Sequence, residues 1–152
     1  MKRAFFTDTL TGSKYDLAAL VEQHEEVTIG RFGNGNVIGL GEANEDLQRR
    51  KTESSGIQKS DVEKLRRLFD AVLKVSRQHA LLRYGDYGLG EGFYLKDQSS
   101  NGTYINSDLY RLGDWTKLRH EDIVSFGGVY DMYFQEVLEE ENRENKNDTS
   151  VY

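Results

Sequence analysis

Cationic, hydroxyl and amide side chains gather in two short polar segments of the chain. Residues 76–79 read Ser-Arg-Gln-His, residues 99–106 read Ser-Ser-Asn-Gly-Thr-Tyr-Ile-Asn, and a Gly30-Arg31 pair stands upstream of both. A phosphorylated side chain carries roughly −1.5 to −2 charge and three acceptor oxygens, so its receptor needs charged donors together with hydroxyl and backbone N–H groups. Two polar loops at this separation can converge on one anion. The sequence therefore predicts a phosphate-reading surface.

Four side chains in these segments supply such donors, namely Arg31, Ser76, Arg77 and Ser100. Arg31 ends an apolar run that is typical of a strand, so the strand end would hold its guanidinium in place. The small Gly30 before it leaves room for a neighbouring loop. His79 follows Ser76 by three residues and is better suited to bracing that loop from inside than to catalysis.

The Asn101-Gly102 pair predicts a tight turn. The Asn101 amide can donate to one peptide carbonyl and accept from a backbone N–H, which orients a ligand independently of its side chains. An Asn-Gly pair standing alone between alternating segments would be an ordinary hairpin turn. The neighbouring motifs are what favour a binding role.

Length and composition limit the class of protein. The 152 residues fit one domain with a substantial core. The absence of cysteine excludes disulfides and thiolate metal sites. No apolar run is long enough for a signal peptide or for the roughly 20 residues of a membrane span. We therefore expect a soluble cytoplasmic protein that does not enter a membrane.

Charge is distributed unevenly along the chain. The net charge is −6, but residues 49–83 hold ten Lys or Arg against four acidic residues and so carry +6. The acidic total argues against nucleic-acid binding. A local basic surface can still attract an acidic ligand, because exposed charges are screened beyond roughly 8 to 10 Å. An ordinary solvated helix face explains the basic segment equally well.

Short stretches rich in β-branched and aromatic residues recur between Gly, Asn and Asp turns, which is the pattern of a β-sandwich or barrel. No internal repeat is present. The expected strands are 4–7, 27–31, 80–84, 92–96, 103–106, 123–126 and 130–137.

One segment breaks this pattern. Apolar residues recur at helical spacing after a Ser60-Asp61-Val62-Glu63 capping box, which predicts a helix from about Asp61 to Lys74. Residues 41–59 are polar and predict a mobile loop, and residues 138–152 predict a disordered acidic tail. The expected organisation is one domain over residues 1–137, with an insertion at 41–72, followed by the tail.

Four blocks of sequence, in this order, are similar to the forkhead-associated (FHA) domain: Gly30-Arg31, residues 76–79, residues 100–106, and residues 118–127. The resemblance covers about residues 4–137. It implies an all-β sandwich of about eleven strands that binds phosphothreonine peptides through apical loops and has no catalytic activity. The implied partner is a protein phosphorylated on threonine by a Ser/Thr kinase.

The same resemblance assigns roles by position. Arg31 and Ser76 would contact the phosphate, Arg77 would line the peptide backbone, and Ser100 and Asn101 would hold the phosphothreonine and its neighbours. Lys74 stands where some relatives select the third residue after the phosphothreonine, and it favours an acidic residue there. The residues implied to support the site are Gly30, His79, Gly102 and Asn106.

Two features depart from the family pattern. Residues 41–72 stand where relatives have a much shorter connection, so they read as an insertion whose helix enters the recognition loop directly. Its basic residues Lys64, Arg66 and Arg67 would enlarge the ligand surface or cover it. His120-Glu121 precedes Asp122 where the family commonly has Gly, so that turn is expected to differ without touching the pocket.

Two other functions are compatible with parts of the sequence. The first is a phosphate-independent interaction or assembly domain that uses the helical insertion, and self-association stays open with it. The second is an enzyme, suggested by the glycines between Gly30 and Gly41, but their spacing fits no nucleotide-binding motif. The three histidines, 24, 79 and 120, lack metal-ligand spacing. We therefore expect no catalytic residues, no metal and no cofactor.

Overall fold

The computed structural model describes residues 1–33, 35–40 and 59–137. The expected mobile loop lies outside them except for Lys59, which belongs to a helix, and the expected acidic tail lies outside them entirely. The described strands are β1 (Ala4–Asp8), β2 (Lys14–Asp16), β3 (Val27–Gly30), β4 (Ile38–Gly39), β5 (Ala80–Asp86), β6 (Glu91–Asp97), β7 (Thr103–Ile105), β8 (Thr116–Lys117), β9 (Ile123–Phe126) and β10 (Tyr130–Glu136). The described helices are α1 (Leu17–Gln23) and α3 (Lys59–Leu73).

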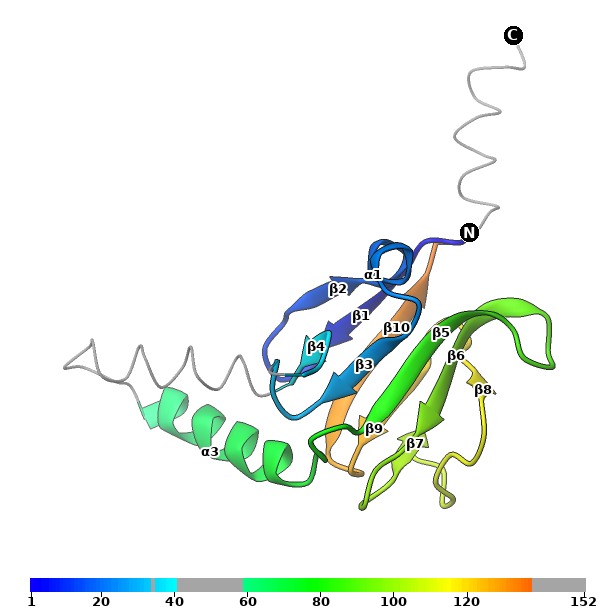
Figure 1. Ribbon diagram of the computed structural model, residues 1–152. Helices are drawn as coiled ribbons and strands as arrows, with labels where there is room; N and C mark the ends of the chain where they lie inside the picture. The colour runs from blue at the N-terminus through cyan, green and yellow to red at the C-terminus, as the bar shows by residue number, and fades with distance from the viewer. Residues whose placement is uncertain (34, 41–58, 138–152) are drawn as a thin grey trace, which may run out of the picture.

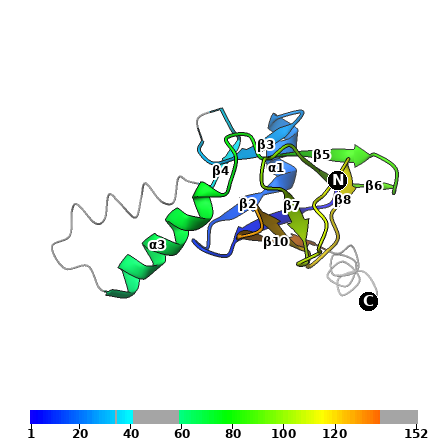
Figure 2. The ribbon, with the colours of Figure 1, turned by 90° about the horizontal axis from the view of Figure 1, so that it is seen from below.

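The strands form two five-stranded sheets that face each other (Figure 1 and Figure 2). One sheet has the order β2-β1-β10-β9-β7 and the other β4-β3-β5-β6-β8. All pairings are antiparallel except that of β3 with β4. The expected β-sandwich is confirmed, with ten strands in the described part of the chain where about eleven were expected.

Alternating side chains from both sheets fill the space between them. Along β1 and β10 every second residue is buried, as expected for strands with one face toward a core. Phe93 of β6 meets Phe134 of β10 across the sandwich with ring centroids 6.1 Å apart, and Phe134 also meets Phe6 of β1 at 5.7 Å. All three rings are fully buried, and the edge-to-face contact of Phe93 with Phe134 joins the two sheets.

Sequence reasoning missed four short elements: β2, β4, β8 and α1. The three strands have only two or three residues, too few for an alternating pattern to be recognised. Helix α1 did have a signal, because Asp16 precedes a run of good helix formers and its carboxylate accepts from the Ala19 N–H at 3.2 Å.

Helix α3 was expected from its apolar spacing and is present, but it begins at Lys59, so Ser60 lies within the helix instead of ahead of it. It extends away from the sandwich in both views and approaches the sheets with its C-terminal end (Figure 1 and Figure 2). Leu68, Val72 and the following Val75 are buried in the main core, which anchors this end. The helix therefore delivers the chain directly to the segment 74–79.

Candidate functional site

Four connections between elements meet at one end of the sandwich: residues 31–37, 74–79, 98–102 and 127–129. Backbone hydrogen bonds tie them together, because the His79 N–H donates to Ile29 O at 2.8 Å, the Gln98 N–H to His79 O at 2.8 Å, and the Gly127 N–H to Gly102 O at 2.7 Å. The polar motifs found in the sequence are thus neighbours in space.

His79 lies fully buried at the centre of these connections. Its Nδ1 accepts the Ser76 N–H at 2.9 Å, and its Nε2 lies 2.9 Å from the carbonyl oxygen of Gly102. Because Nδ1 is an acceptor, the proton of the neutral ring must be on Nε2, where it is donated to Gly102. Burial lowers the pKa of His79, although the hydrogen bond to Gly102 opposes this effect. The ring braces two loops at once in its neutral form.

Gly30 allows the first loop to approach the second. A Cβ atom at this position would lie 1.9 Å from the carbonyl oxygen of Arg77. This distance is too short for any side chain, so only glycine fits here. The side-chain amide of Asn36 bridges the same two loops, donating to Arg77 O at 2.7 Å and to Phe32 O at 2.8 Å. Asn36 was missed in the sequence, where it is one of several polar residues in a glycine-rich stretch.

Arg31 caps the C-terminal end of α3. The last turn of the helix tightens through bonds from the Lys74 N–H to Ala71 O and from the Val75 N–H to Val72 O, which leaves Leu73 O without a partner from the helix. The Arg31 guanidinium donates to Leu73 O from Nη2 at 3.4 Å and to Val75 O from Nε at 2.8 Å. A cation is favourable here because the carbonyl end of a helix carries partial negative charge.

Ser76 and Ser100 are also brought together. The Arg31 N–H donates to Ser76 O at 3.0 Å, and the Ser76 hydroxyl oxygen accepts the Ser100 N–H at 3.0 Å. Asn101 follows, and its side-chain Nδ2 donates to Lys74 O at 3.1 Å. Residues 74–76 therefore link Arg31 on one side to Ser100 and Asn101 on the other, through backbone carbonyls and the Ser76 hydroxyl.

Asp97 and Arg111 hold the loop at residues 98–102 in shape. One carboxylate oxygen of Asp97 accepts from the Ser99 hydroxyl at 2.5 Å and from the Thr103 hydroxyl at 2.8 Å. The other oxygen accepts from Arg111 Nε at 3.0 Å and Nη2 at 2.7 Å, and Nη2 also donates to Ser99 O. Burial on its own raises the pKa of Asp97, but the hydrogen bonds from Ser99, Arg111 and Thr103 outweigh it and lower the pKa.

Neither Asp97 nor Arg111 was found from the sequence. Asp97 did carry a local signal, because an Asp two residues before a Ser commonly makes an Asx turn, and here the Ser99 N–H donates to it at 3.1 Å. Arg111 lies on a separate connection, and nothing in the sequence relates it to Asp97.

The predicted site residues differ in how they are placed. Lys74 and Arg77 are exposed, and within the described residues their charged groups have no hydrogen-bond or ion-pair partner. Gly102 is buried between the loops, where its carbonyl meets His79. Asn106 lies outside this cluster, because its side chain donates to Asp122 at 3.0 Å and accepts the Ile123 N–H at 2.8 Å.

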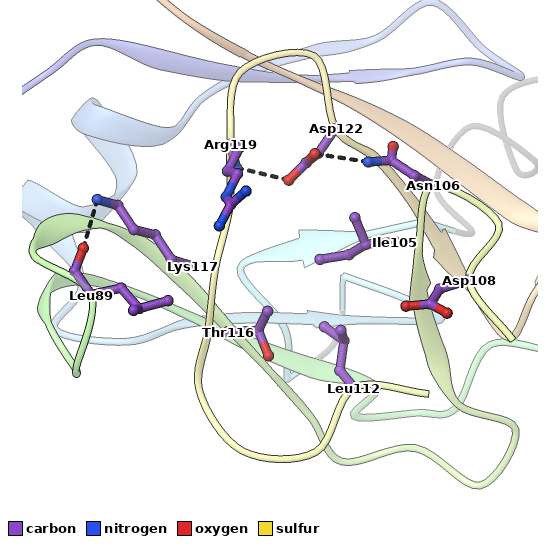
Figure 3. Close-up of a pocket in the computed structure, with 9 residues that line it drawn as sticks. All are labelled: Leu89, Ile105, Asn106, Asp108, Leu112, Thr116, Lys117, Arg119 and Asp122. Carbon is purple, nitrogen blue, oxygen red and sulfur yellow. Dashed lines mark hydrogen bonds between the residues drawn. The ribbon is translucent and has the colours of Figure 1, made fainter. Parts of the chain in front are cut away.

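Asn106 instead lines a pocket of about 520 Å³ at the edge of the sandwich, where β7 and β8 are the outermost strands of their sheets (Figure 3). Leu89 and Lys117 lie together on one side of it, and the apolar side chains of Ile105 and Leu112 lie on the opposite side. Apart from Asn106, no residue predicted to bind or support a ligand lines this pocket.

Electrostatics favour an anion at the end where the loops meet. Segments 31–37, 74–79 and 98–102 contain Arg31, Lys74 and Arg77 and no carboxylate. Arg111 is paired with Asp97 and adds little net charge. Ser100 and Asn101 are exposed, and hydrogen bonds to the Ser76 hydroxyl oxygen and the Lys74 carbonyl oxygen join them to the segment that carries two of these cations. This is the donor set that a phosphate group requires.

The described residues contain no cluster of His, Asp or Glu able to hold a metal ion. Within the same part of the chain, no helix is both long and apolar enough to cross a bilayer.

Solved structures show the same fold. The MEK1 FHA domain in complex with a HOP1 pThr peptide has 16% identity and a TM-score of 0.51, covering 88% of this chain and 95% of that one. The FHA-1 domain of Mycobacterium tuberculosis Rv1747 has 18% identity and a TM-score of 0.52, covering 90% and 98%. An FHA domain from Arabidopsis thaliana has 18% identity and a TM-score of 0.53, covering 91% and 88%.

A comparison with curated protein sequences finds no match. Residues 67–127, which include the end of α3, the segment 74–79 and the Ser99–Gly102 loop, match the family described as FHA domain. The family match over residues 67–127 and the shared two-sheet fold confirm the resemblance to the FHA domain that was seen in the sequence.

Proposed function

We propose that the protein binds segments of other proteins that carry phosphothreonine, as an interaction module without catalytic activity. The observation that carries this proposal is the meeting of three loops, with three cations and no carboxylate, around one buried neutral histidine. The MEK1 FHA domain, solved with a phosphothreonine peptide on the same fold, supports the proposal. The phosphate would be written by a Ser/Thr kinase acting on the partner.

Each proposed contact follows from the position of a side chain. Arg31 keeps three of its five N–H donors after the bonds to Leu73 and Val75, so it can cap α3 and still contact a phosphate. The Arg31 backbone N–H donates to Ser76 O, and the Ser76 hydroxyl oxygen accepts the Ser100 N–H, so we expect the hydroxyl groups of these two serines to join Arg31 in contacting the phosphate. Arg77 and Asn101 would contact the peptide backbone, and exposed Lys74 would favour an acidic residue beyond the phosphothreonine.

The absence of catalysis is also part of the proposal. His79, the histidine at the site, uses both ring nitrogens for hydrogen bonds to the backbone, so neither is free to move a proton. The other residues at this end are hydroxyl, amide and cationic groups without an adjacent base. Such a set binds and orients an anion.

The test is a titration of matched peptides that differ only in phosphorylation. Fluorescence anisotropy with degenerate peptides around a central phosphothreonine would measure affinity for the phosphorylated and unphosphorylated forms. Hydrogen bonds to charged groups contribute about 1.5 to 3 kcal/mol each, so the phosphorylated form should bind at least about tenfold more tightly. Equal affinity for the two forms would reject the proposal.

A second candidate is phosphate-independent assembly through α3. It is favoured by one observation, that Val62, Phe69 and Leu73 of this helix are exposed although they are apolar. This candidate requires that Arg31→Ala leave partner binding unchanged while substitution of the exposed apolar residues abolishes it. Loss of partner binding in Arg31→Ala, with binding kept when the exposed apolar residues are substituted, would exclude assembly through α3.

A further inference from the structure

Helix α3 carries two apolar faces, and only one of them is buried. Leu65, Leu68 and Val72 are buried, and the last two belong to the main core. Val62, Phe69 and Leu73 are 42%, 37% and 63% exposed. Arg66 is also exposed, and the four residues at positions 62, 66, 69 and 73 are separated by four, three and four positions. This spacing places them along one side of the helix. We name Val62, Arg66, Phe69 and Leu73 the α3 strip.

The α3 strip begins where the proposed phosphate site ends. The carbonyl oxygen of Leu73 accepts from the Arg31 guanidinium, so the last residue of the strip contacts the first residue of the site. The next residue, Lys74, accepts from Asn101 through its carbonyl oxygen at 3.1 Å. A peptide held by Arg31 and Asn101 therefore lies next to the end of α3.

We propose that the phosphothreonine ligand also carries apolar residues that pack on the α3 strip, so that this helix sets a second element of sequence specificity. This inference rests on the proposed function. The occupant is the ligand itself because the strip is continuous with the ligand site and shares its charge. Arg66 within the strip and Lys74 at its end are cations with no ion-pair partner among the described residues, which suits a phosphorylated, acidic peptide.

Helix geometry specifies the spacing of those apolar residues. Phe69 and Leu73 are four residues apart, which corresponds to about 6 Å along a helix axis. In an extended peptide, side chains on the same face are two residues apart, or about 6.6 Å. A pair of apolar residues separated by one residue thus matches Phe69 and Leu73. An acidic residue farther from the phosphothreonine would then lie near Arg66.

The experiment uses the full chain and peptides with one central phosphothreonine in a serine and glycine background. Leucine pairs separated by one residue are placed at successive positions on both sides of the phosphothreonine, because an extended peptide can follow α3 in either direction. For the wild type, one placement should strengthen binding about fivefold or more, as expected from partial burial of two leucine side chains. The Leu73→Ser, Phe69→Ser double variant should lose this gain.

A matched control separates specificity from general loss of apolar surface. Leu89 is 66% exposed, a fraction similar to the 63% of Leu73. It lies on the β5–β6 connection, at the end of β5 away from His79. Leu89→Ser should keep the full gain from the leucine pair. Circular dichroism of the double variant should show an unchanged helix content, since both substituted side chains face solvent.

Three other outcomes would contradict either the role of the α3 strip or the proposed phosphothreonine binding. If the double variant and the wild type bind every phosphorylated peptide equally, the α3 strip plays no part and the proposed function still stands. If phosphorylated and unphosphorylated peptides bind equally, the proposed function fails and this inference fails with it. If the wild type sediments as a dimer that the double variant does not form, and leucine pairs have no effect, the strip binds a second copy of the chain and the inference is wrong.

Discussion

The Nε of Arg31 donates to the carbonyl oxygen of Val75 at 2.8 Å, across more than forty residues of sequence. The same guanidinium donates to the carbonyl oxygen of Leu73, the last residue of α3. Helix α3 and the proposed phosphate contact are therefore connected through one side chain. A change in either is expected to affect the other.

Substitution of Arg31 should therefore reduce phosphopeptide binding even when positive charge is kept. We expect Arg31→Ala to weaken binding at least about tenfold, since it removes charge-assisted bonds to the phosphate. Arg31→Lys should also weaken it, because an ammonium lacks the fork of donors that allows Arg31 to bind the Val75 carbonyl and a phosphate together. Anisotropy titration measures both effects. Arg119→Ala, at the distant pocket, serves as the control, and an unchanged affinity of Arg31→Ala would contradict the assignment.

Stability should depend on pH through His79. Its pKa is lowered in the folded protein by burial, so below about pH 6.5 the unfolded chain binds more protons than the folded chain. The stabilisation that neutral His79 provides is fully present above about pH 6.5. The free energy of unfolding should fall as the pH drops from there toward the lower pKa of His79 in the folded protein. Protonation of Nδ1 also removes the acceptor of the Ser76 N–H.

Urea unfolding at several pH values between about 7.5 and 5 measures this effect. His79→Gln should flatten the dependence in that range because no titrating ring remains at the site, whereas His24→Gln, at an exposed position, should keep the wild-type slope. An identical slope in His79→Gln and the wild type would show that another group is responsible.

Gly30→Ala should destabilise the protein at the site. The new methyl group would overlap the Arg77 carbonyl oxygen, so the loop at 74–79 or strand β3 must shift. Overpacking of this kind costs about 1 to 3 kcal/mol, and the displaced loop should also weaken phosphopeptide binding. Gly113→Ala is the matched control, because a Cβ there meets nothing within 4 Å. Equal unfolding free energies for the two variants would contradict the close approach of the loops.

Asp97→Asn should loosen the Ser99–Gly102 loop without creating a cavity. The Asp97 side chain is only 4% exposed and accepts from Ser99, Thr103 and Arg111, so loss of its charge should cost about 1 to 3 kcal/mol. Its lowered pKa means that the wild type keeps this stabilisation above about pH 4 and loses it as the pH falls through the folded value. Asp114→Asn, at a largely exposed carboxylate, should change stability little. The variants are compared by urea unfolding at neutral pH.

The sequence by itself determined the class of fold and most of its main elements. Short stretches rich in β-branched and aromatic residues between Gly, Asn and Asp turns predicted the strands β1, β3, β5, β6, β7, β9 and β10, because this composition is a local property of each strand. The apolar spacing of α3 is equally local. The short strands β2, β4 and β8 are held by pairing with neighbours, so their own residues carry too little information.

Residue types and their order were enough to name the predicted ligand residues, and the roles of these residues stay predictions. They are Arg31, Lys74, Ser76, Arg77, Ser100 and Asn101. Only the tertiary structure decided what holds them. Asn36, Asp97 and Arg111 act through contacts between distant segments, and hydrogen bonds of that kind leave no periodic pattern in a sequence. The structure also decided that Asn106 supports the turn at Asp122 and that Arg31 caps α3, because both facts depend on how the chain packs in space.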